Sequence, residues 1–153
     1  MTELDLTYHD LVKQVKQMSE KACWCTSTDE LMKEVPILDN LVCLNNQFYI
    51  ISQFPSFSIA YISPGIQQLL GISPNSFSMK TFYSRIHPDD YPVVLMATKK
   101  MTEIIDEHYK EIVPYESVFT LDYRLKADDG RYLRFLNQNC VICKEDCCMK
   151  FLS

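Results

Sequence analysis

The chain has 153 residues and a formal net charge of −5, with 47% hydrophobic and 23% charged residues. This length suits one domain plus an extension, with a hydrophobic core of its own. The negative charge argues against nucleic-acid binding by the chain itself, because phosphate contact requires a clustered basic surface. The N-terminal segment has no apolar signal core, and no run is long enough to span a membrane. We therefore expect a cytoplasmic protein.

The first forty residues have a helical pattern. Apolar side chains recur every three or four positions, and Ser27 with Glu30 has the spacing of a capping box at the start of a second helix. Pro36 is expected to end that helix or to open a new turn. We interpret residues 1–45 as a helical extension that either covers an apolar surface of the domain or forms a dimer. The residues assigned to a dimer helix are Leu4, Leu11, Val15 and Met18.

The spacing of apolar residues changes from a helical to a strand-like pattern near residue 47. The stretches "QFYIISQF" and "SIAYIS" are short, β-branched and aromatic, which predicts two strands. Ser63-Pro64 and Ser73-Pro74 then predict the starts of two short helical turns, with the serine oxygen as cap in each, and Gly71 predicts the stop between them.

A longer helix is predicted after residue 87. Pro88 would take its first position, and Asp89 and Asp90 its first turn, where the helix dipole favours anions. The final third alternates in hydrophobicity, with a hairpin turn at residues 128–130 and a last strand in "CCMKFLS". This order predicts an α+β fold, a five-stranded antiparallel sheet with helices on one face.

Three stretches carry a resemblance to a known family. "YISPGIQQLLGISPNSF", "FYSRIHPDDYPVV" and "LDYRLKADDGRYLRF" occur in this order, and together they resemble a PAS domain of the third subtype. The resemblance covers residues 46–153 and implies a sensor domain whose sheet is clasped by short helices, with its last strand truncated.

The predicted N-terminal helices and the sequence "FYSRIHPDD" are similar to the sensory parts of PAS-containing LuxR-type transcriptional regulators of Bacteroidetes. That similarity implies a homodimer that contacts DNA only through a separate C-terminal domain.

The resemblance also implies a ligand pocket between the sheet and the helical clasp. The alternative is that these positions simply fill the core. The residues expected to line the pocket are Ile50, Ile59, Tyr61, Leu69, Phe82, Leu95, Phe119, Leu121 and Phe135.

Known cofactors of the superfamily can be compared residue by residue. Flavin-binding light sensors carry a reactive cysteine on the clasp, and "MKTFYSRIH" has none. Haem-binding members use a histidine on the long helix, whereas His87 precedes that helix and His108 lies near its far end. We expect neither flavin nor haem.

Seven cysteines are present, four of them near the C-terminus at Cys140, Cys143, Cys147 and Cys148. The first two have the spacing of a zinc half-site, but residues three apart on a regular strand point to opposite faces. We expect reduced structural thiols and no metal, with a zinc site as the alternative.

No pattern for catalysis accompanies these features. The three histidines lack a neighbouring nucleophile, and there is no phosphate loop or metalloprotease motif. We therefore expect a non-enzymatic sensory module in signal transduction that binds a small ligand or partner. The alternative is a ligand-free dimerisation module, for example of a sensor histidine kinase.

Overall fold

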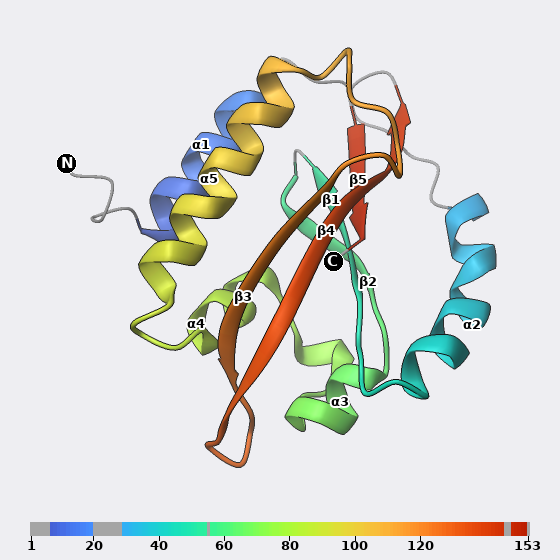
Figure 1. Ribbon diagram of the computed structural model, residues 1–153, viewed down its shortest axis with the longest axis vertical. Coiled ribbons are helices and arrows are strands. Elements are labelled where there is room, and N and C mark those ends of the chain that lie inside the picture. Colours follow the sequence, from blue (N-terminus) through green and yellow to red (C-terminus); the bar gives the residue numbers. More distant parts are fainter. Residues whose placement is uncertain (1–6, 20–28, 55, 146–147, 153) are drawn as a thin grey trace.

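The computed structural model describes residues 7–19, 29–54, 56–145 and 148–152 (Figure 1). The helices are α1 (Tyr8–Ser19), α2 (Asp29–Cys43), α3 (Gly65–Leu70), the 3₁₀ turn η2 (Pro74–Ser76), α4 (Met79–Arg85) and α5 (Tyr91–Glu107). The strands are β1 (Ile50–Phe54), β2 (Ser58–Ile62), β3 (Val118–Lys126), β4 (Tyr132–Glu145) and β5 (Cys148–Leu152).

The sheet is built from two antiparallel hairpins, β1–β2 and β3–β4, which β5 joins. The strand order is β2-β1-β5-β4-β3. Gly130 makes the tight turn between β3 and β4 with a φ of 87°, a left-handed conformation that favours glycine. The expected α+β class is confirmed.

Most helices pack on one face of the sheet, which we call the inner face. Ile66 and Leu70 of α3, Tyr83 of α4 and Leu95 of α5 share a core with Leu125 of β3. The sheet and these helices thus form two layers around one core.

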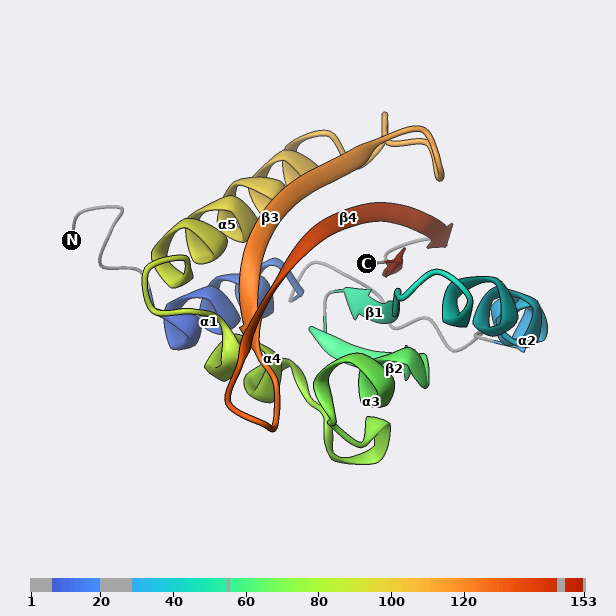
Figure 2. The ribbon, with the colours of Figure 1, turned by 60° about the horizontal axis from the view of Figure 1, so that its bottom comes forward.

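Helix α1 belongs to this inner layer and runs beside α5 (Figures 1 and 2). Leu11 is completely buried in the inner core, and the backbone N–H of Tyr8 donates to the hydroxyl of Tyr91 at the start of α5 over 3.1 Å. The side chain of Leu11 is therefore used within the chain and is not available for a dimer contact.

Helix α2 lies on the other side of the curved strands (Figure 2). Val35 packs there against Tyr49, Ile51 and Ile142, so helices cover both faces of the sheet. The expectation that Pro36 ends or restarts this helix is wrong, because α2 continues through Pro36 to Cys43. A proline inside a helix costs about 3 kcal/mol, and the packing of the residues around it against the sheet offsets that cost.

The two Ser-Pro pairs do begin helical turns, but neither serine side chain caps one. Ser63 is fully buried, and its Oγ accepts from the backbone N–H of Tyr49 over 2.9 Å, which fixes the start of β1 to the end of β2. The hydroxyl that does cap a helix is that of Ser78, which accepts from the N–H of Thr81. Gly71 ends α3 with a φ of 75°, as expected.

The long helix starts later than expected. Pro88 lies in the turn before it, and α5 begins at Tyr91 with Pro92 in its first turn. Asp90 does not cap α5 with its side chain. It binds Arg124 of β3 through Nε at 2.9 Å and Nη2 at 2.7 Å, and this pair ties the start of α5 to the sheet.

Candidate functional site

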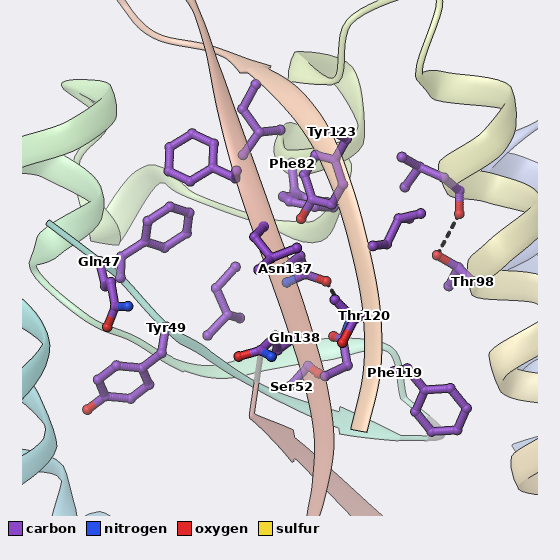
Figure 3. A pocket seen from close by; sticks show the side chains of 18 of the residues that line it. Gln47, Tyr49, Ser52, Phe82, Thr98, Phe119, Thr120, Tyr123, Asn137 and Gln138 are labelled. Atoms are coloured by element: carbon purple, nitrogen blue, oxygen red, sulfur yellow. Dashed lines mark hydrogen bonds between the residues drawn. The ribbon is translucent and has the colours of Figure 1, made fainter. Parts of the chain in front are cut away.

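A cavity of about 970 Å³ lies between the inner face of the sheet and helices α4 and α5 (Figure 3). Its walls are mainly apolar and aromatic. They include Phe48, Leu69, Met79, Phe82, Val94, Ala97, Met101, Phe119, Leu121, Tyr123, Leu133 and Phe135. Several rings pair edge to face, among them Phe48 with Phe135 at 5.5 Å between centroids.

Six of the nine residues expected in the pocket line this cavity. They are Ile50, Leu69, Phe82, Phe119, Leu121 and Phe135. Leu95 is completely buried among core residues and does not line it. The remaining two, Ile59 and Tyr61, lie on β2 and do not line it either.

A β-bulge separates Ile59 from Tyr61. Ile51 pairs with Tyr61 and Ser52 pairs with Ile59, so Ala60 is an extra residue on β2. Ile59 packs against the inner core, whereas Tyr61 packs on the outer face beside α2. The expectation that Tyr61 faces the pocket is therefore wrong, because a bulge changes the face on which side chains two residues apart point.

The cavity wall also contains polar residues that were not among the candidates, and two of them form a pair on β4. Asn137 and Asn139 of β4 pair with Leu121 and Phe119 of β3, and all four residues belong to the lining. The side chain of Asn139 donates from Nδ2 to Oδ1 of Asn137. The alternation of side chains between the two faces of a strand predicts both residues in the cavity wall, because they follow Phe135 at steps of two.

The hydroxyl groups of the inner helices are already engaged. Tyr83 donates to Oγ1 of Thr98 over 3.2 Å, and Thr98 donates to the carbonyl oxygen of Val94 over 2.9 Å. Burial raises the pKa of Tyr83 and of Tyr123 above the usual tyrosine value, which disfavours their ionised forms.

One lining residue carries a charge. Arg134 is exposed at the rim, and its guanidinium binds Asp122 over 2.6 Å. The other lining residues that the structure describes are uncharged. The cavity can therefore hold an uncharged molecule by apolar contact and a few hydrogen bonds, but it offers no inward-facing cation for an anion.

The cavity reaches the surface along β4. All residues from Leu133 to Cys140 line it, although alternate ones point to opposite faces of the sheet. Within the described residues, Cys140 to Glu145 of β4 pair with β5.

The histidines considered for haem lie outside the cavity lining. The ring of His87 packs against Tyr132, with centroids 4.6 Å apart, and its Nδ1 accepts from the N–H of Asp89. His108 is exposed at the end of α5, beside Glu111 at 3.1 Å.

The remaining candidates are described only in part. Leu4, Ser27 and Cys147 lie outside the described residues, and the structure does not describe the side chains of Val15, Met18, Cys143 and Cys148. Cys140 is half-buried and packs with the cluster beneath α2. Within the described ranges, no helix is both long and apolar enough to cross a membrane.

Comparison with family models and solved structures shows which proteins the chain is similar to. The model of the PAS fold family, in its third form, matches residues 59–150. Among solved structures, the chain is similar to the N-terminal domain of a diguanylate cyclase with PAS/PAC sensor from Marinobacter aquaeolei, with 19% identity and a TM-score of 0.48. That similarity covers 69% of this chain and 92% of the other. The comparison with curated proteins found no match. The family model matches more than half of the residues of this chain, and the chain therefore belongs to the PAS fold family.

Proposed function

We propose that this chain is a sensory domain of a signal-transduction protein and that it binds a small molecule in the inner cavity. The observation that carries the proposal is the cavity itself, which has apolar walls and a pair of inward-facing amides. Ligand sites in proteins typically combine a concave apolar surface with a few placed polar groups. The six expected lining residues that meet there support this position for the site.

Strand β1 and the segment before it offer a route for the signal. Phe48 and Ile50 line the cavity and belong to the inner core, whereas Ile51 packs on the outer face against α2. A ligand that shifts the inner side chains of this strand would also shift the surface on which α2 rests. A preference of the ligand for one position of α2 would transmit its binding to that helix.

The wider context of the domain is also a proposal. The similarity of "FYSRIHPDD" and of the N-terminal helices to LuxR-type regulators supports a role as the regulatory, dimeric part of a transcription regulator. In this role the chain would bind and signal without catalysis. A helix-turn-helix domain encoded in the same reading frame is the expected finding, and a catalytic output domain there would contradict it.

Native mass spectrometry tests ligand binding. The wild-type protein is compared with Leu121→Trp, which adds volume to the cavity wall, after both have been incubated with the small-molecule extract of the source cells. We expect an extra mass on the wild type that is lost on denaturation and is absent from Leu121→Trp. Equal extra mass on both proteins, or none on the wild type, would contradict the proposal.

A further inference from the structure

We infer that the inner cavity selects an uncharged, largely apolar carbonyl compound, and that the side chain of Asn137 donates to its carbonyl oxygen. This inference rests on the proposed function, because it names the class of ligand for the same site. It follows from the charge of the lining, from the hydrogen bonds of the amide pair and from the shape of the walls.

Among the described residues, the lining has no charge to offer an ionic ligand inside the cavity. The one charged side chain among them, Arg134, lies on the exposed face of β4 and is paired with Asp122. Transfer of a carboxylate or ammonium group from water into an apolar site is strongly unfavourable unless an opposite charge meets it. Anionic and cationic ligands are therefore selected against.

The amide pair leaves one donor group for a ligand. Asn139 donates to Oδ1 of Asn137, which occupies the oxygen of Asn137 and fixes the orientation of its amide. Within the described part of the chain, Nδ2 of Asn137 has no hydrogen-bond partner. A primary amide carries two donor hydrogens, and a carbonyl oxygen with its two lone pairs can accept from them. An apolar molecule without an acceptor would leave this half-buried donor unsatisfied, and such a molecule would therefore bind the cavity with lower affinity.

The walls around the amide pair favour a flat molecule. Phe135 precedes Asn137 on the same face of β4, and Leu121 pairs with Asn137 on β3. Phe48 and Phe82 line the cavity from the segment before β1 and from α4. Aromatic rings pack favourably edge to face or offset, so a planar apolar body gains contact on several sides.

Two probes of equal shape test the inference. 2-Naphthamide is uncharged, and 2-naphthoate carries a carboxylate at pH 7 in place of the amide. Calorimetric titration of the wild-type protein should give binding of 2-naphthamide and affinity on the order of 100-fold lower for 2-naphthoate. Asn137→Ala should weaken 2-naphthamide roughly three- to tenfold. The control Asn75→Ala, at an exposed position outside the lining, should leave both affinities unchanged.

The outcomes separate this inference from the proposed function. Equal affinity for the two probes, or no effect of Asn137→Ala in a folded variant, would overturn the carbonyl selectivity but leave a ligand site. Failure of both probes on a protein that carries a bound cellular mass would also overturn only the selectivity. Failure of both probes together with absence of any bound mass would overturn the inference and the proposed site. If Asn137→Ala does not fold, Asn137→Ser takes its place, with a loss of affinity again expected.

Discussion

Tyr61 of β2 donates its hydroxyl hydrogen to Oδ2 of Asp39 on α2 over 2.6 Å. The hydroxyl of Tyr49 donates to Oδ1 of the same carboxylate over 2.8 Å, and the two rings lie 5.7 Å apart. Both tyrosines belong to the outer face of the sheet. One carboxylate of α2 thus receives one hydrogen bond from β2 and another from the residue directly before β1, and this contact fixes α2 on the sheet.

Removal of one of these hydroxyls should loosen α2. Tyr61→Phe deletes a hydrogen bond to a charged acceptor, for which a loss of about 1–3 kcal/mol in the free energy of unfolding is expected. Hydrogen exchange of the α2 amides should become faster, while exchange in α5 changes little. Tyr132→Phe, at a partly exposed ring on β4, is the matched control. Unchanged exchange of α2 in Tyr61→Phe would show that Asp39 does not hold this helix.

Alkaline pH should destabilise the fold through the buried tyrosines. Tyr83 and Tyr123 are 3% and 4% exposed, and burial raises the pKa of both above the ordinary value of 10.0. Above pH 10 the unfolded chain loses these protons and the folded chain keeps them, so stability falls as the pH rises. Each such tyrosine should cost about 1 kcal/mol per pH unit.

Denaturant titrations between pH 8 and 11.5 measure this effect. Tyr123→Phe should show a smaller loss of stability above pH 10 than the wild type does. Tyr115→Phe, which changes a tyrosine that is 67% exposed, should retain the wild-type slope. Identical slopes for all three proteins would mean that Tyr123 titrates as an exposed residue.

Acid pH should lower the stability of the fold by protonating Asp90. Hydrogen bonds from the guanidinium and the backbone N–H of Arg124 hold the pKa of Asp90 well below its usual range. Below about pH 4 the unfolded carboxylate takes up a proton more readily than the folded one, so the stability that this pair contributes is present above that pH and is lost as the pH falls.

Asp90→Asn should therefore lower the Tm at pH 7 and flatten the decrease in Tm between pH 5 and 2. Asp106→Asn, at an exposed position of α5, is the control and should leave both quantities near the wild-type values. A wild-type Tm profile in Asp90→Asn would exclude a role of the pair in stability.

Gly65 is required where α3 meets the segment before β1. A Cβ atom at this position would overlap the backbone carbonyl oxygen of Gln47. Gly65→Ala should lower the free energy of unfolding by about 3 kcal/mol, because two backbone segments would have to move apart. A Cβ atom at Gly130 would have no atom within 4 Å, and only the φ of 87° disfavours alanine there. Gly130→Ala should therefore lower the free energy of unfolding by about 1 kcal/mol. Chemical denaturation compares the two, and an equal cost would show that the contact at Gly65 relaxes freely.

The local patterns of the sequence predicted the strands and most of the helices in their order, but not α4. Alternating side chains, the glycines at 71 and 130 and the aromatic stretches predicted strands and turns that the structure contains, because these depend on neighbours along the chain. The same periodicity placed six residues in the cavity wall. It would also have included Asn137 and Asn139 if polar residues had been followed through the strand.

The errors arose where tertiary packing decides. No local signal marks Ala60 as a bulge, so the face of Tyr61 could not be derived from spacing. The hydroxyl of Ser63 is claimed by the N–H of Tyr49, a residue distant in sequence, rather than by its own helix. Pro36 remains within α2 because the helix packs on the outer face of the sheet, a contact that the first forty residues alone do not reveal.

We propose above that a small molecule binds on the inner face of the sheet. Nuclear Overhauser effects between 2-naphthamide and the protein in solution test where it binds. We expect contacts from the naphthalene protons to Leu121, Phe135 and Met101, which line the cavity from β3, β4 and α5. Contacts of the bound probe instead to outer-face residues such as Tyr61 would contradict it.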